Sequence, residues 1–138
     1  MKARIDWIRD LTFVGESGSG HGVVMSASKQ AAPTVAPSPM EYVLLGTGGC
    51  TATDVIAILE KGRHVVRRCE VTLDADRAET DPKVFTRVQF HFKITGKGLT
   101  RDVVERAIKL SAEKYCSASA MIGKTAALSH DFEIVNEA

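Results

Sequence analysis

Residues 38–61 constrain the fold most, because they predict one long helix with clear ends. Ser38 is a favourable N-cap, Pro39 suits the first helical position, and Glu41 completes a Ser-x-x-Glu capping box. We expect the helix to run from Pro39 to about Lys61, with Gly62 as the residue that ends it. Apolar side chains are spread around most of its circumference, which predicts a central, buried helix.

Segments that alternate between apolar and polar residues lie on both sides of this helix and predict strands. Glycines between the second and third of them predict a hairpin or a binding loop at 16–21, and three prolines predict a surface connection at 27–39. A turn is expected at 76–83. The predicted strands are residues 2–8, 11–15, 22–26, 65–75, 84–95 and 128–135.

Two more helices are predicted in the second half of the chain. Thr100 can cap a helix over residues 101–115, and a short helix follows at 118–124. Strands and helices that are grouped rather than strictly alternating indicate the α+β class, with an antiparallel sheet. At 138 residues, we expect a single domain over 1–138.

Composition excludes several functions. Lys plus Arg number 18 and Asp plus Glu 17, without a basic or acidic block, so binding to nucleic acid or an anionic membrane is not expected. The N-terminus has no apolar run typical of a signal peptide, which predicts a cytoplasmic protein. Residues 40–59 come nearest to a membrane span, but Glu41 and Asp54 argue against one.

Cys50 lies in the middle of the long predicted helix, within Gly-Gly-Cys-Thr-Ala at 48–52. Gly46, Gly48 and Gly49 precede it, and each costs a helix about 1 kcal/mol relative to Ala. Either a tight helix crossing or room for a substrate or second thiol over Cys50 explains them. Asp54, one turn later, shares the face of Cys50, and its charge disfavours a thiolate there.

Cys116 lies within Tyr-Cys-Ser-Ala-Ser-Ala at 115–120, 66 positions after Cys50. If it begins the helix at 118–124, free backbone amides would lower the pKa of its thiol. A small buried residue at a helix junction is the alternative. Cys69 belongs to the apolar face of a predicted strand, which indicates an inert core residue.

The remaining polar candidates have simpler interpretations. Glu41 lies nine residues before Cys50, which turns it to the far side of the helix, and its capping role suffices. His21, His64, His91 and His130 show no metal-ligand spacing, and His21 alone sits in a glycine-rich turn. We therefore expect no metal and no cofactor.

Residues 38–50, Ser-Pro-Met-Glu-Tyr-Val-Leu-Leu-Gly-Thr-Gly-Gly-Cys, and residues 113–120, Glu-Lys-Tyr-Cys-Ser-Ala-Ser-Ala, resemble the OsmC/Ohr family, and its YhfA-like branch in particular. The resemblance covers essentially the whole chain. It implies an intertwined homodimer in which a curved antiparallel sheet packs on two long central helices. It also implies active sites at the dimer interface.

The resemblance assigns roles to the two thiols. Cys50 would attack a hydroperoxide and become a sulfenic acid, Cys116 would condense with it to a disulfide, and an external dithiol would reduce the pair. Peroxide-reducing members also use a Glu after the helix-starting Pro and an Arg from a Gly-Gly-Arg turn. Met40 stands in place of that Glu, and the matching turn at 15–18, Gly-Glu-Ser-Gly, has no Arg.

Two functions remain open from the sequence. The first is a slow thiol peroxidase that reduces organic or inorganic hydroperoxides through a Cys50–Cys116 disulfide. The second is a non-catalytic protein of the same fold that senses redox state or binds a small apolar ligand. The two hypotheses differ on whether the chain is an enzyme.

Overall fold

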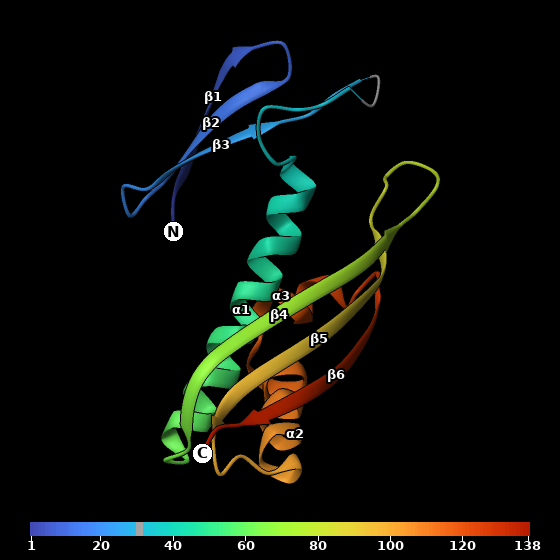
Figure 1. Cartoon of the computed structure of the whole chain (residues 1–138). Helices are drawn as coiled ribbons and strands as arrows, with labels where there is room; N and C mark the ends of the chain where they lie inside the picture. Colours follow the sequence, from blue (N-terminus) through green and yellow to red (C-terminus); the bar gives the residue numbers. More distant parts are fainter. Residues whose placement is uncertain (30–31) are drawn as a thin grey trace. The chain divides into compact units, whose positions relative to one another are not determined.

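A computed structural model describes residues 1–29 and 32–138 (Figure 1). The chain divides into two compact units, residues 1–45 and residues 46–138.

The first unit is an antiparallel sheet in the order β1-β2-β3, with β1 at Ala3–Arg9, β2 at Thr12–Ser17 and β3 at Gly22–Ser26. The three predicted strands are confirmed, with shifts of one or two residues. A hairpin joins β2 to β3, and the Ser17 backbone N–H donates to the His21 carbonyl at 2.9 Å. The described part of residues 27–39 contains no strand and no helix before Pro39, and residues 30–31 lie outside the described residues.

The turn expected at residues 15–18 begins later than predicted. Gly15 lies inside β2, where it pairs with Ile5 of β1 and Val23 of β3. A Cβ at Gly15 would come within 3.2 Å of the Met25 side chain, so this glycine allows close packing inside the sheet. The hairpin turn begins only after Ser17.

Helix α1 covers Pro39–Lys61, as predicted. The capping box is confirmed, because the Ser38 N–H donates to Glu41 Oε2 at 2.6 Å and the Glu41 N–H donates to Ser38 Oγ at 3.2 Å. The Ser38 backbone hydrogen bond lowers the pKa of the Glu41 carboxyl. The predicted C-terminus is wrong in one respect: Arg63, with φ of 63°, takes the left-handed conformation in place of Gly62. At Gly62 there is little room for a side chain, since a Cβ added there would lie 2.8 Å from the His64 ring.

Helix α1 is buried along one stripe, made of Thr47, Gly48, Thr51, Val55 and Leu59. The expectation of a helix buried on most sides is therefore wrong for the single chain. Its apolar content is nevertheless high, and by length and composition α1 is the one helix in the described residues that could cross a membrane. Core helices meet the same criterion, and the stripe that packs into the second unit agrees with a core role.

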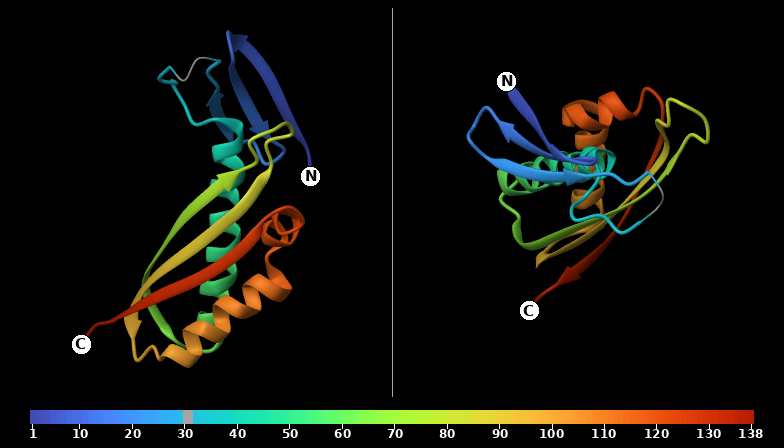
Figure 2. Two further views of the ribbon diagram at one scale, coloured as in Figure 1. Left: turned by 90° about the vertical axis from the view of Figure 1, so that its right-hand side faces the viewer. Right: turned by 90° about the horizontal axis from the view of Figure 1, so that it is seen from above.

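The second unit contains a sheet in the order β4-β5-β6, with β4 at Val65–Arg77, β5 at Phe85–Lys97 and β6 at Ala127–Asn136. Strands β4 and β5 are antiparallel, as expected. Strand β6 runs parallel to β5, so this sheet is mixed and not purely antiparallel. The helices between β5 and β6 form the crossover that a parallel pair requires, and Figure 2 shows them on one face of the sheet.

The core of the second unit lies on the helix side of that sheet. Val88, Phe90, Phe92 and Ile94 alternate along β5 and are fully buried. Cys69 of β4 pairs with Ile94 and is half-buried on the same face. The prediction that Cys69 shares the apolar face of its strand is confirmed.

The crossover is less regular than the sequence predicts. Helix α2 covers Arg101–Leu110 and is capped by Thr100, whose Oγ1 accepts from the Val103 N–H at 3.4 Å. Where a single helix was expected through residue 115, Ser111–Tyr115 form a π-helical turn, η1. Helix α3 follows at Ser117–Ile122.

Candidate functional site

The two predicted site cysteines lie together in the second unit. Cys50 Sγ of α1, Cys116 Sγ and a carboxylate oxygen of Asp54 all lie within 4.8 Å of one another. Cys50 and Asp54 are half-buried, whereas Cys116 is 3 % exposed. All three cysteines are free thiols in this structure. The two sulfurs are thus neighbours without being bonded.

The π-helical turn connects the cysteines through Ser111. Its fully buried hydroxyl donates to Asp54 Oδ2 at 3.1 Å and lies 3.1 Å from Thr51 Oγ1 on α1. Because the single Ser111 proton goes to Asp54, the Thr51 hydroxyl must donate to Ser111. The Cys116 N–H in turn donates to the Ser111 carbonyl at 2.9 Å. Ser111 therefore fixes both the carboxylate and the backbone of the second cysteine.

Ser111 was not predicted as a site residue. Helical periodicity does not distinguish an α turn from a π turn, and a serine inside a helix has no specific signature. The only available signal was the presence of a small polar residue where the apolar pattern continues around it. π-Turns occur frequently at functional sites, which agrees with this position.

Cys116 is the N-cap of α3, which confirms its predicted position at the start of this helix. Its Sγ accepts from the Ser119 N–H at 3.4 Å. The expected lowering of its pKa is nevertheless wrong. Burial raises the pKa of the Cys116 thiol and outweighs the Ser119 hydrogen bonds, and the neighbouring Cys50 thiol raises it further.

The glycines before Cys50 have different environments. A Cβ at Gly48 would lie 2.7 Å from Leu73 Cδ1, so Gly48 lets α1 approach β4 closely. Gly46 and Gly49 have no atom within 4 Å of the place that a Cβ would take. Close packing of α1 against a strand, and not against another helix, thus explains Gly48. The surface over Gly46 and Gly49 is open in the single chain.

A pocket of about 470 Å³ adjoins the carboxylate of this site. Asp54, Lys61 and Arg106 line it together with apolar side chains, namely Ala57, Ile58, Leu110 and Tyr115. No ion pair joins Asp54 to Lys61 or to Arg106 in the described part of the chain. Cationic groups therefore border the pocket without neutralising the carboxylate.

The other candidates lie apart from the thiol pair. Burial raises the pKa of Cys69, in keeping with a core residue. His21 is exposed and contacts Ser19 in its hairpin. His91 pairs with Asp131 at 2.5 Å, and His130 stacks on Phe90 with its pKa lowered by burial. Histidine contributes to no group of possible metal ligands among the residues that the structure describes.

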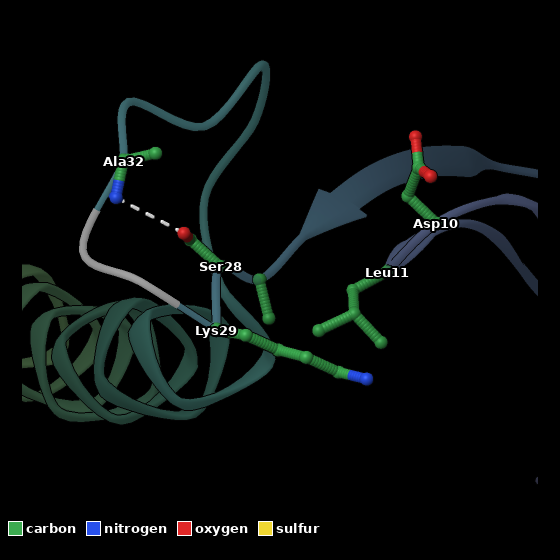
Figure 3. Close-up of a pocket in the computed structure, with 6 residues that line it drawn as sticks. Asp10, Leu11, Ser28, Lys29 and Ala32 are labelled. Atoms are coloured by element: carbon green, nitrogen blue, oxygen red, sulfur yellow. Dashed lines mark hydrogen bonds between the residues drawn. The ribbon is translucent and has the colours of Figure 1, made fainter.

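A second pocket belongs to the first unit. Figure 3 shows Asp10, Leu11, Ser28, Lys29 and Ala32 around it, with the Ala32 N–H donating to Ser28 Oγ at 3.0 Å. The described residues that line it contain neither a thiol nor an imidazole.

Comparisons with known proteins identify relatives over the full length of the chain. The chain is 47% identical to Protein YhfA of Escherichia coli over 135 residues, which cover 98% of each protein. A hypothetical protein from Aquifex aeolicus is 27% identical, with a TM-score of 0.85 and coverage of 99% and 97%. An organic hydroperoxide resistance protein OsmC from Legionella pneumophila, described as a predicted redox protein, has the same fold, with a TM-score of 0.70 and 16% identity over 99% of this chain and 96% of its own.

A family model described as OsmC-like protein matches residues 30–131. This range includes both cysteine segments, Asp54 and Ser111. Together with the full-length identity to YhfA, the match means that the chain belongs to the OsmC family.

Proposed function

We propose that this protein is a slow thiol peroxidase that reduces organic or inorganic hydroperoxides through a Cys50–Cys116 disulfide. The observation that carries the proposal is the approach of the two sulfurs to within 4.8 Å. A disulfide requires them to close to about 2.05 Å. A general role in redox chemistry or peroxide resistance agrees with the family.

The different burial of the thiols supports their order of action. Half-buried Cys50 can meet a hydroperoxide, whereas Cys116 is almost completely covered. Cys50 attacks the peroxide oxygen, which yields Cys50 sulfenic acid and an alcohol from an organic hydroperoxide, or water from hydrogen peroxide. Cys116 then attacks the sulfenic sulfur, and water leaves as the disulfide forms. An external dithiol returns both cysteines to thiols.

The surroundings of the thiols support a low rate. Burial raises the pKa of the Cys116 thiol, which disfavours the thiolate that must attack the sulfenic acid. Met40 replaces the Glu of peroxide-reducing relatives, and the strand that holds Gly15 and Glu16 offers no Arg. Lys61 and Arg106 line the pocket beside Asp54, and neither forms an ion pair with it in the described residues.

Turnover tests the proposal directly. Reduced protein supplied with cumene hydroperoxide and excess dithiothreitol should consume many equivalents of peroxide per chain. The Cys69→Ser variant provides a matched control, because Cys69 lies on the core face of β4, and it should retain the rate. Consumption equal to the background reaction of dithiothreitol would exclude the peroxidase.

The second chemical step should depend on pH. Because burial raises the pKa of Cys116, little of it is thiolate at neutral pH, and only the thiolate attacks. Stopped-flow measurements should therefore find that the conversion of the Cys50 sulfenic acid to the disulfide accelerates between pH 7 and 9, by up to about tenfold per pH unit. A rate that is constant over this range would contradict the assignment of Cys116 as the attacking thiol.

A ligand-binding role is the second candidate. The pocket beside Asp54 has a largely apolar lining and about 470 Å³ of space, enough for a small ligand. A protein that retains an apolar ligand but consumes no peroxide would support a binding or redox-sensing function. Native mass spectrometry of the purified protein distinguishes the two, because the ligand would add a discrete mass.

We further propose that residues 1–138 act as one OsmC-like domain in a cytoplasmic homodimer. Proteins of the OsmC family are generally homodimers. Ile5, Trp7 and Ile8 of β1 are all more than half exposed in the single chain, and a partner subunit would cover such a surface. The expected partners are thus a second copy, a hydroperoxide and a dithiol reductant, with neither nucleic acid nor membrane.

A further inference from the structure

Cys50, Asp54 and Cys116 form the one group of possible metal ligands found in residues 1–29 and 32–138. Each offers one donor atom, two sulfurs and one carboxylate oxygen, and these atoms lie within 4.8 Å of one another. Cys50 and Asp54 lie one turn apart on α1, so both side chains point to the same side of the helix. Cys116 supplies the third donor from the junction of η1 and α3.

The donor set suits zinc. Two thiolates and a carboxylate are all zinc ligands, and thiolate sulfur disfavours magnesium and calcium. With Zn–S bonds of about 2.3 Å, two sulfurs of a tetrahedral site lie roughly 3.8 Å apart. The three donor atoms already lie within 4.8 Å of one another, close to this spacing. Three protein ligands leave the fourth position open to water or a small ligand.

Outer contacts already orient two of the three donors. The Ser111 hydroxyl donates to Asp54 Oδ2 at 3.1 Å, and the Ser119 N–H donates to Cys116 Sγ at 3.4 Å. Such hydrogen bonds to ligands are a regular feature of metal sites and strengthen them. In the described part of the chain, Asp54 forms no ion pair, so no cationic side chain balances its negative charge.

We propose that Cys50, Asp54 and Cys116 bind one Zn²⁺ per chain when the thiols are reduced. Binding replaces the two thiol protons by the metal, and both protons leave to solvent. A disulfide has no thiolate to donate, so the metal-bound and the oxidised states exclude each other. The site does not depend on peroxidase activity, and it revises the expectation of no metal.

Competition with a chromophoric zinc chelator tests this site on the reduced full-length protein. Wild type and Cys69→Ser should each bind one equivalent of Zn²⁺, while excess Mg²⁺ should not compete. Cys50→Ser should weaken binding by more than about 100-fold, since even outer-contact changes cost about 10–100-fold. Asp54→Asn should weaken it by at least about 10-fold. With Co²⁺ in place of Zn²⁺, the thiolate charge-transfer absorption should decrease in Cys50→Ser.

Several results would overturn the zinc site. The zinc site is wrong if wild type leaves all zinc with the chelator. It is also wrong if Asp54→Asn binds zinc as tightly as wild type, or if Cys69→Ser loses zinc binding. Circular dichroism establishes that each variant is folded. If Cys116→Ser is unstable, Cys50→Ser and Asp54→Asn are sufficient to test the metal ligands. Metal-free wild-type protein, prepared with excess chelator, should still form the peroxide-induced disulfide, which separates failure of the zinc site from failure of the peroxidase.

Discussion

Cys50→Ser should abolish peroxide consumption with dithiothreitol as the reductant. A serine hydroxyl at this position cannot be oxidised to a sulfenic acid, so the first covalent step is lost. Removal of a covalent nucleophile lowers the rate by several orders of magnitude. A coupled assay that follows the loss of cumene hydroperoxide provides the measurement.

Cys116→Ser is the informative partner of that variant. In the absence of dithiothreitol, its Cys50 can still react once, so the variant should consume about one equivalent of peroxide and then accumulate a sulfenic acid that a dimedone adduct reveals. Cys69→Ser should behave as wild type. Full activity in Cys50→Ser, or equal loss in Cys69→Ser, would contradict the assigned roles.

Gly96→Ala should lower the free energy of unfolding more than any of the other substitutions proposed for this protein. A Cβ at Gly96 would overlap the Val65 carbonyl oxygen and would lie 2.8 Å from Leu99 Cδ1. The first contact is with backbone, at the point where β4 and β5 pair, so a rotamer change cannot relieve it. We expect the free energy of unfolding to fall by about 3 kcal/mol. Thermal unfolding should then occur roughly 10 °C lower.

Lys97→Ala is the matched control for Gly96→Ala, because Lys97 is the exposed neighbour in the same strand. It should change the midpoint of unfolding by less than about 2 °C. A Gly96→Ala variant as stable as this control would mean that the strands adjust their spacing easily at this point.

Local signals account for the parts of the fold that the sequence predicts well. The capping box of Ser38 and Glu41 fixes the beginning of α1, and alternation locates β3, β4 and β5. The parallel direction of β6 has no such signal, since the same alternating pattern fits both pairings. The π turn at 111–115 and the left-handed Arg63 likewise depend on tertiary packing.

The proximity of Cys50 and Asp54 was predictable from the sequence, whereas the role of Ser111 and the approach of Cys116 were not. Cys50 and Asp54 share a helix face by spacing alone, and the structure bears this out. Their approach to Cys116 depends on the crossover, through Ser111 in η1. The pKa of Cys116 departs from the prediction because a helix-start position favours thiolate only slightly, whereas burial acts on the whole charge.

Identification of the disulfide tests the central claim most directly. Reduced wild-type protein receives one equivalent of cumene hydroperoxide, its free thiols are alkylated, and its peptides are mapped by mass spectrometry. The proposed mechanism predicts that the peptides of Cys50 and Cys116 are linked and that Cys69 is alkylated. Alkylation of both Cys50 and Cys116, or a link of either one to Cys69, would contradict it.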